Sequence, residues 1–356
     1  MAEELLPPAG VIFHTSHGKY EPAGIGGEHL VYLDPYGEQL YHDTGDIRDR
    51  FVVKVNCVAT RDGYGPDAIQ PPLQALKADA ANRNARYSRL RAVFGDDAVY
   101  QASTVRHEYL TASAVNAIWQ GAAPPQSEGP TYVSATIQDY VPELADPASY
   151  TSLRAPYTER FREEIDPELY AKVGNRWLAS SDPTPPTPQE VDEFLAVQRG
   201  DSLRALVGTA AHDTAIAIAL GRFGKNAAQY SNATREILDL TGEGNVIITT
   251  DGRCKVIDGL FPRPLKLLDD LPVVLEKVAK FDGLNYRDYI CLLNTLGYVR
   301  TVNFLSALGG GTEQLALALP PTLPPELWRR TYSLLRTFST RSALLATTAV
   351  SGQTVG

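Results

Sequence analysis

The residue pattern changes character near Pro142, and this change limits what the chain can fold into. Before this residue, short stretches such as EHLVYL and RFVVKVN alternate between apolar and polar side chains, which is typical of strands. After it, long stretches have the apolar spacing of helices. At roughly 100–200 residues per domain, a chain of 356 residues is expected to form two parts. We therefore predict an α+β fold with a strand-rich part, residues 1–141, and a helix-rich part, residues 142–356.

Turn and helix signals define the elements of the strand-rich part. The polar, turn-rich stretch over residues 36–50 is typical of a hairpin loop. Apolar spacing predicts a helix over residues 73–94, and Gly95 is a good C-terminal stop. Strands are expected near residues 99–110 and 132–140.

The helix-rich part begins with an insertion near residues 143–200, which contains helical patterns and a proline-rich break. A long, alanine-rich helix is predicted over residues 202–230. His212 and Asp213 are neighbours in that helix, where side chains point about 100° apart, so we expect a structural role.

Charge and composition exclude several classes of protein. Hydrophobic residues make up 44% of the chain, which is enough for a sizeable core, and 33 basic against 42 acidic residues leave a net charge of −9. This charge argues against a protein that binds nucleic acid through bulk attraction. The sequence contains no run of about 18 apolar residues, which a membrane-spanning helix would require. The stretch MAEELLPPAG has no secretory signal pattern. Three scattered cysteines form no CxxC pair, so we expect reduced thiols in the cytoplasm.

Two features of the strand-rich part could carry chemistry. The first is the glycine-rich stretch GIGGEHLVY, residues 24–32, because glycines allow the backbone to approach phosphates closely. A strand follows it, whereas a Rossmann loop requires a helix. The second is Lys54, in the middle of an apolar strand, where it must reach water or bind an anion. Taken alone, these features are better explained by an ordinary glycine hairpin and an edge-strand lysine that faces water.

A third feature is the hairpin that runs from Asn245 to Asp258, with a turn at Asp251-Gly252. A short hairpin brings its two ends together, so the oxygens of Asn245 and Asp258 could face one cation. Mg²⁺ prefers hard oxygen ligands, usually one or two carboxylates together with phosphates. The alternative is that both residues simply form turns at strand ends.

The order of these features resembles that of the protein-kinase-like superfamily over roughly residues 18–300. GIGGEHLV matches its glycine-rich loop and FVVK its nucleotide-binding lysine. TIQDYVP matches the hinge, NVII the end of the catalytic loop, and KVIDG the metal-binding aspartate. The resemblance implies a two-lobed fold, with a small antiparallel-sheet lobe and a larger helical lobe, that binds ATP and Mg²⁺.

The resemblance also implies roles for individual residues. Gly24 and Gly26 match the first two loop glycines, Gly27 lies beside them, and His29 occupies the third position. The implied nucleotide contacts are those of Val31 and Val52 with the adenine ring, Lys54 with the phosphates, and the Asp139 carbonyl and Val141 amide with the adenine edge. Asn245 and Asp258 are the implied Mg²⁺ ligands.

The sequence also departs from the family pattern. No glutamate lies between Lys54 and Glu108, so Asp79 is the only acid that the predicted helix offers to the lysine. Leu240 occupies the usual place of the catalytic aspartate, and Asp239 lies one position earlier. After Asp258 no clear activation segment follows. Asp239 is therefore the candidate that would orient the acceptor hydroxyl.

Three alternatives for the function follow from this resemblance. The first is ATP-Mg²⁺-dependent phosphotransfer to a hydroxyl of a protein or a small molecule. The second is a pseudokinase, a nucleotide-binding scaffold without transfer, which the missing glutamate and displaced aspartate favour. A third alternative is a kinase-fold enzyme that transfers another part of ATP. Retention of Lys54, Asn245 and Asp258 favours an active enzyme.

Overall fold

The computed structural model describes residues 21–25, 29–33, 35–46, 50–56, 73–100, 102–110, 131–155, 166–178, 184–198, 200–261, 267–280, 283, 288, 292–315, 326–327, 329–331 and 333. The chain divides into two compact units, one of Met1–Arg89 with Tyr100–Asp146 and one of Leu90–Val99 with Pro147–Gly356. The sequence had led us to expect the division after residue 141. Helices and antiparallel strands are both present, so the fold class is α+β, as predicted.

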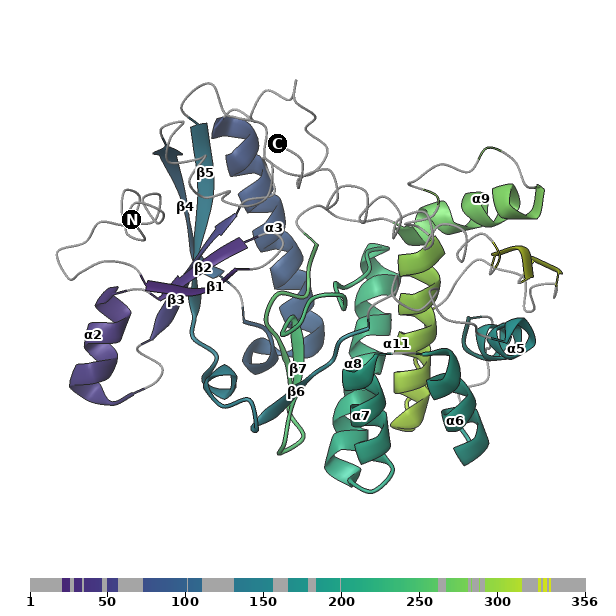
Figure 1. Cartoon of the computed structure of the whole chain (residues 1–356). Coiled ribbons are helices and arrows are strands. Elements are labelled where there is room, and N and C mark those ends of the chain that lie inside the picture. Colours follow the sequence, from purple (N-terminus) through teal and green to yellow (C-terminus); the bar gives the residue numbers. More distant parts are fainter. Residues whose placement is uncertain are drawn as a thin grey trace, which may run out of the picture. The chain divides into compact units, whose positions relative to one another are not determined.

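A five-stranded antiparallel sheet forms the centre of the first unit, with the strand order β1-β2-β3-β5-β4 (Figure 1). Its elements are β1 (Glu21–Ile25), β2 (His29–Leu33), α2 (Pro35–Thr44), β3 (Phe51–Asn56), α3 (Leu73–Phe94) as far as Arg89, β4 (Ala102–Leu110), β5 (Thr131–Asp139) and the 3-10 turn η5 (Pro142–Ala145). Strand β3 is covered on both faces, because the neighbouring side chains of Val52 and Val53 are only 9% and 0% exposed. The predicted strands therefore assemble into one sheet around β3.

Helix α2 corrects the sequence prediction of a hairpin loop over residues 36–50. Pro35 opens the helix, a position where proline is favoured, and Glu38 lies in its first turn, where a negative charge is favourable. Gly45 follows the helix with a φ of 70°. The loop prediction was wrong because Gly45 and the polar residues around it terminate a short helix rather than form a β-turn.

Helix α3 has the predicted bounds, and Gly95 follows it with a φ of 94°. Arg83, Arg86 and Arg89 recur every three residues on α3, a spacing that predicts a solvated face, but this prediction is wrong because Arg86 is only 1% exposed and lies near buried Tyr87, at 5%. At about 100° per residue, Arg89 points roughly 120° away from Arg83 and is exposed, whereas Arg83 is half-buried. A three-residue spacing therefore drifts around the helix and does not keep one face.

Helices dominate the second unit. Its elements are η4 (Asp96–Ala98), β6 (Tyr150–Ser152), α5 (Pro167–Leu178), α6 (Pro188–Val197), α7 (Asp201–Ala210), α8 (Thr214–Thr234), β7 (Val246–Thr249), β8 (Cys254–Val256), α9 (Leu267–Lys280), the π-helical turn η7 (Leu292–Leu296) and α11 (Gly297–Leu308). One of the helical patterns expected in the insertion, over residues 157–164, lies outside the described residues. Helix α11 is buried from Gly297 to Ala307, which makes it the central helix of this unit.

Helices α8 and α11 lie side by side, and glycines allow their close approach (Figure 1). A Cβ atom added at Gly221 would lie 2.3 Å from the Cα of Gly309. One added at Gly224 would lie 2.3 Å from the backbone nitrogen of Ser306. Both distances are far below van der Waals contact, so only glycine fits at these positions.

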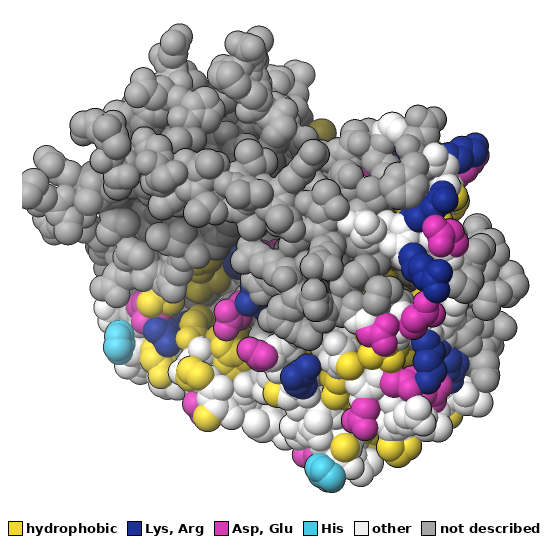
Figure 2. All heavy atoms as spheres, turned by 45° about the vertical axis from the view of Figure 1, so that its right-hand side comes forward, with side chains coloured by type: hydrophobic (Ala, Val, Ile, Leu, Met, Phe, Trp, Pro, Cys, Tyr) yellow, Lys and Arg dark blue, Asp and Glu magenta, His cyan; other side chains and the backbone are white. Residues whose placement is uncertain are grey.

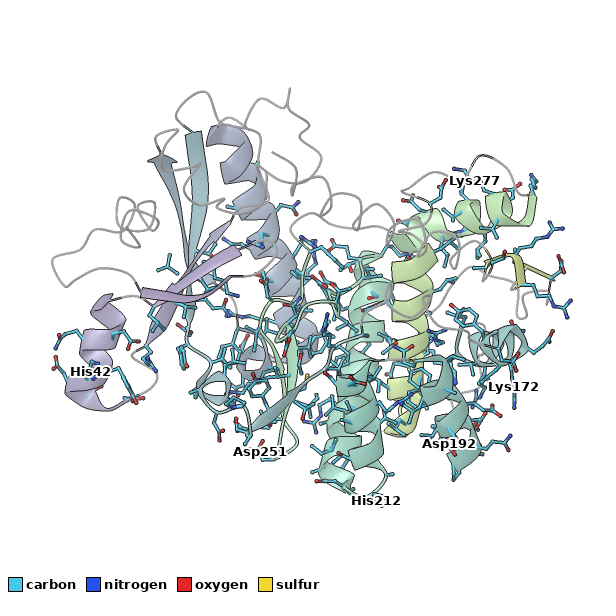
Figure 3. All side chains as sticks on the ribbon, viewed as in Figure 1. His42, Lys172, Asp192, His212, Asp251 and Lys277 are labelled. Carbon is cyan, nitrogen blue, oxygen red and sulfur yellow. The ribbon has the colours of Figure 1, made fainter. Side chains whose placement is uncertain are left out.

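The predicted 202–230 helix is two helices, α7 and α8, with a break at His212 and Asp213. Asp213 is the N-cap of α8, and its Oδ1 accepts hydrogen bonds from the backbone N–H groups of Ala215 (2.8 Å) and Ile216 (3.3 Å). Figure 3 shows His212 at the turn between the two helices. The single-helix prediction was wrong because the aspartate cap interrupts a continuous apolar pattern.

A second, three-stranded antiparallel sheet has the order β6-β7-β8. Strands β7 and β8 form the predicted hairpin, and Asp251 lies at its tip (Figure 3). Val99 forms an isolated parallel bridge with Val256 of β8. Every residue of β7 is buried, so this hairpin is anchored in the core of the second unit.

The face of the molecule in Figure 2 mixes basic and acidic side chains with scattered hydrophobic ones. Among the described residues, ion pairs such as Arg176–Glu190 (3.0 Å) and Arg329–Glu168 (2.6 Å) join side chains of opposite charge. Within the described ranges, no helix combines the length and apolar character that crossing a membrane requires.

Candidate functional site

Asp239, Asn245 and Asp258 are brought together by one loop of the second unit. The loop follows α8 and leads into β7, whereas Asp258 follows β8. The backbone N–H of Asp239 donates to the carbonyl of Gly259 (2.9 Å), the residue after Asp258. The backbone carbonyl of Asn245 accepts from the N–H groups of Ile257 (2.8 Å) and Asp258 (3.2 Å). The two ends of the hairpin are thus joined directly to the segment that carries Asp239.

The carboxylate of Asp239 is held by the residues that follow it. Its Oδ1 accepts hydrogen bonds from the backbone N–H of Thr241 (2.9 Å) and from the Thr241 hydroxyl (2.6 Å). This is an aspartate turn, in which a side chain caps its own loop. Asp239 is 8% exposed, whereas Leu240, at the usual position of the family's catalytic aspartate, is fully buried at 0%. The side-chain orientation of Asp239 is therefore fixed by its own loop.

Asn245 connects the loop to Asp239 through its side chain. Its Nδ2 donates to the backbone carbonyl of Asp239 at 3.3 Å. A Cβ atom added at Gly242 would lie 2.5 Å from this Nδ2 and 2.7 Å from Oδ1, so the amide packs directly on the glycine backbone. Gly244, with a φ of 78°, makes the turn that brings Asn245 back towards the loop. Glycines at both positions allow the asparagine to reach its partner.

The last residue of β6 and the segment after it hold this loop from one side. The backbone N–H of Ala155 donates to the Leu240 carbonyl (2.7 Å), and Arg154 Nε donates to the Thr241 carbonyl (3.1 Å). The Ser152 hydroxyl accepts from the backbone N–H of Gly244 (2.9 Å). These bonds hold the loop at three points along its length, so its backbone is pre-organised before any ligand binds.

Burial and charge alter the acidity of Asp239. Burial raises the pKa of its carboxyl above the ordinary value, hydrogen bonds from Thr241 oppose this, and the nearby Asp258 carboxylate raises the pKa further. Asp239 and Asp258 are therefore close enough to repel each other. A cation between or beside them would relieve this repulsion.

The chemistry of this donor set fits one hard cation with help from a ligand. Among the described residues, no group of three or more His, Cys, Asp or Glu side chains is placed to hold a metal ion. Asp258 and Asn245 would supply one carboxylate and one amide oxygen, and the Asp258 carboxylate acts electrostatically on that of Asp239. Mg²⁺ is commonly held by one or two carboxylates together with substrate phosphates. The residues thus fit a magnesium ion that arrives with a phosphate-bearing ligand.

Lys54 lies on β3, the central strand of the first unit's sheet, so the edge-strand explanation does not apply. Register places Val31 of β2 and Thr136 of β5 directly opposite it, and their side chains share its face. Val52, two residues earlier on β3, is on the same face. Lys54 is half-buried, and the Thr136 hydroxyl donates to its backbone carbonyl (3.4 Å). The sheet therefore brings Val31, Val52 and Lys54 together.

Residues Asp139 to Val141 follow the end of β5. Phe51 lies opposite Asp139, and the Tyr140 N–H donates to the Arg50 carbonyl (3.2 Å). Phe51 and Asp139 are thus a non-hydrogen-bonded pair, so the backbone carbonyl of Asp139 points away from β3. The ladder with β4 ends opposite Gln138. The Asp139 carbonyl therefore lies one residue beyond that ladder.

Several predicted residues have no described counterpart. Gly24 lies at the irregular register of β1 opposite Val31, but Gly26 and Gly27 lie outside the described residues. The side chain of Asp79 is also outside them. Lys54, Asp139 and Val141 belong to the first unit, and Asp239, Asn245 and Asp258 belong to the second.

The sequence interpretation missed the residues that support Asp239. Thr241 could have been found, because an aspartate followed two positions later by threonine is typical of a capped turn. No sequence pattern indicated that the Asn245 amide packs on Gly242. Ser152 and Arg154 are about 90 residues away along the chain, and no local pattern indicated them.

No family model matches this chain, and no curated protein matches it significantly. The geometry of the two units is therefore the basis on which a function can be inferred.

Proposed function

We propose that this protein is an ATP-Mg²⁺-dependent phosphotransferase of the protein-kinase-like type, with a hydroxyl acceptor on a protein or a small molecule. One observation carries the proposal: Asp239, Asn245 and Asp258 converge through direct backbone and side-chain hydrogen bonds. Two carboxylates beside an amide oxygen form a donor set that phosphoryl transfer uses. Val31, Val52 and Lys54 are neighbours in the sheet of the first unit, and they are the side chains that we propose contact the nucleotide.

Each residue then has a defined task. Asp258 and Asn245 hold Mg²⁺, which neutralises phosphate charge when bound. Lys54 binds the phosphates, and the Asp139 carbonyl with the Val141 N–H binds the adenine edge. Val31 and Val52 contact the adenine ring. These tasks are mainly positioning and charge neutralisation, which supply most of the catalysis in phosphoryl transfer.

Asp239 handles the proton of the acceptor. The acceptor oxygen forms a bond to the γ-phosphorus of ATP while the bond from that phosphorus to the bridging oxygen breaks, which releases ADP. The hydroxyl proton passes to the Asp239 carboxylate. Thr241 holds Oδ1 of that carboxylate, so the task falls to Oδ2. A raised pKa favours this role, because a carboxylate of higher proton affinity is a better base.

A nucleotide-binding scaffold without transfer is the second candidate. The observation that favours it is that α3 contains no glutamate, so Asp79 is the one acid that this helix could offer to Lys54. A scaffold would keep nucleotide binding and lack turnover.

The deciding experiment follows the γ-phosphate and the α-phosphate of ATP separately. Purified protein is incubated with Mg²⁺ and either γ-labelled or α-labelled ATP, together with lysate proteins and pools of small metabolites. Transfer of the γ-label alone supports the phosphotransferase, whereas transfer of the α-label indicates nucleotidyl transfer. Nucleotide binding without movement of either label supports the scaffold. Asp239→Asn serves as the control for transfer that depends on the site.

A further inference from the structure

Helix α2 is fastened to the start of β3 by a forked ion pair. Arg50 Nε donates to Glu38 Oε1 (2.6 Å), and Arg50 Nη2 donates to Glu38 Oε2 (2.8 Å). The two side chains are only 18% and 22% exposed. Two parallel bonds between a guanidinium and a carboxylate fix both distance and orientation, which a lysine cannot reproduce.

The same guanidinium lies over two tyrosine rings. Its Cζ atom is 4.8 Å from the ring centre of Tyr41 on α2 and 4.7 Å from that of Tyr140. Both distances are within cation–π range, and partial desolvation strengthens such contacts. Arg50 therefore contacts helix α2 through Glu38 and Tyr41, and the segment after β5 through Tyr140.

A backbone hydrogen bond also joins Arg50 and Tyr140. The N–H of Tyr140 donates to the carbonyl of Arg50 at 3.2 Å, just before the paired residues Phe51 and Asp139. Tyr140 lies between the two residues whose backbone groups we propose to bind adenine, Asp139 and Val141. One residue, Arg50, thus holds both the backbone and the side chain at the centre of this three-residue segment.

We infer that Arg50 is a positioning residue for adenine recognition, acting on segment 139–141 and itself oriented by Glu38 of α2. The inference rests on the proposed function, because it requires that segment 139–141 binds the base. The guanidinium fixes the tyrosine and so sets the direction of the flanking carbonyl and amide. It has no part in binding the phosphates, which belongs to Lys54 and the metal ligands.

Because Arg50 is expected to affect binding of the base and not of the phosphates, ligands with and without the base test the inference. The full-length protein with Mg²⁺ is titrated calorimetrically with ATP and, separately, with inorganic tripolyphosphate, which has the phosphates and lacks the base. The variants are Arg50→Lys, Arg50→Gln and Glu38→Gln. Arg329→Lys is the matched control, because Arg329 forms a surface pair with Glu168 in the second unit.

We expect Arg50→Gln and Glu38→Gln to weaken ATP binding by about two- to thirtyfold and to leave tripolyphosphate binding unchanged. Arg50→Lys should fall between wild type and Arg50→Gln, because it keeps the charge and loses the fork. The double variant that combines Arg50→Gln with Glu38→Gln should bind ATP no more weakly than Arg50→Gln alone. Arg329→Lys should bind both ligands as the wild type does.

The outcomes that would overturn the inference are distinct. If ATP affinity is unchanged in the Arg50 variants, Arg50 does not position the segment. If ATP and tripolyphosphate affinities fall together, Arg50 is merely structural and the inference fails. If the wild type binds neither ligand, the proposed function fails, and the inference fails with it. Circular dichroism and melting curves confirm that each variant is folded.

Discussion

The side-chain amide of Asn245 donates a hydrogen bond to the backbone carbonyl of Asp239 at 3.3 Å. This bond joins the candidate metal ligand to the candidate base within one loop. Because the Asp239 carboxylate is also bound to Thr241, any displacement of Asn245 is transmitted to the base through the loop backbone. Metal binding and proton handling are therefore expected to change together when this bond is altered.

Removal of the Asn245 amide tests this connection. Asn245→Ala should lower the free energy of unfolding by about 0.5–1.5 kcal/mol, the usual net contribution of one hydrogen bond. It should also abolish the Mg²⁺-dependent part of nucleotide binding. Chemical denaturation and titration calorimetry measure the two effects.

Asn232→Ala is the control for Asn245→Ala. The Nδ2 of Asn232 also donates to a backbone carbonyl, that of Gln314 (3.0 Å), but at an exposed site. The control should keep full nucleotide binding. Equal nucleotide affinity in Asn245→Ala and wild type would contradict the assigned role of Asn245.

Gly242 gives a second test of the same contact. The Cβ of Gly242→Ala would lie 2.5–2.7 Å from the atoms of the Asn245 amide, so the amide must move. We expect a loss of nucleotide binding similar to that of Asn245→Ala. Gly208→Ala is the matched control, because nothing lies within 4 Å of its added Cβ and it is inside helix α7. That control should stabilise the protein by about 0.4–1 kcal/mol in urea denaturation.

Local patterns predicted the parts of the fold that local physics determines. The β7–β8 hairpin follows from an apolar run interrupted by Asp251-Gly252, and α3 follows from helical spacing that ends at Gly95. The α7–α8 break escaped prediction, because Asp213 reads equally well as a helix residue and as a cap. Arg86 was misassigned, since its burial depends on tertiary packing that a helical pattern does not contain.

Parts of the candidate site also follow from local sequence patterns, and other parts depend on long-range contacts. The proximity of Asn245 and Asp258 follows from a short hairpin, and the structure joins them through the Asn245 carbonyl. The neighbours of Lys54 could not be predicted, because Thr136 is 82 positions away along the chain. The support of the Asp239 loop by Arg154 depends on a similar long-range contact. Such contacts are determined by strand order and packing, which single-sequence patterns leave open.

A side chain added at the glycine contact between α8 and α11 should lower the stability of the protein. Gly221→Ala places a Cβ 2.3 Å from the Cα of Gly309, and the two backbones must separate. We expect the free energy of unfolding to fall by about 1–3 kcal/mol, the usual cost of overpacking. Denaturation with urea measures it. Stability equal to that of the wild type would mean that the helices are not held this closely.

Magnesium-dependent nucleotide binding gives a test at Asp258. At a ligand concentration about 100-fold above Kd, ATP with Mg²⁺ should raise the free energy of unfolding by about 2.7 kcal/mol. Asp258→Ala should remove this increase, which thermal shift measures. Asp251→Ala, at the exposed tip of the same hairpin, should retain it. A wild type that does not respond to ATP and Mg²⁺ would exclude both the enzyme and the scaffold.

The last prediction concerns Asp239, where stability and activity should change in opposite directions. Its pKa is raised in the folded state, mainly by burial, so the folded protein binds a proton more tightly than the unfolded chain does. Its contribution to stability is then fully present below the unfolded pKa and is lost as the pH rises through the folded pKa. At neutral pH the buried charge therefore destabilises the fold. Asp239→Asn removes this charge, and its amide oxygen can still accept from Thr241.

We expect Asp239→Asn to be more stable than the wild type at pH 7 in EDTA, with the difference shrinking as the pH falls towards 4. Phosphotransfer should fall by about 10²- to 10⁴-fold, the usual share of acid–base catalysis.

Asp251→Asn is the control with the opposite sign, because hydrogen bonds with Thr249 and Arg253 lower the pKa of Asp251. It should be no more stable than the wild type at pH 7 and should keep full activity. If Asp239→Asn is less stable at pH 7 but not at pH 4, the hydrogen bonds from Thr241 to the charged carboxylate outweigh the cost of its burial, and the predicted sign is wrong. If it keeps full activity, the base lies elsewhere in the chain.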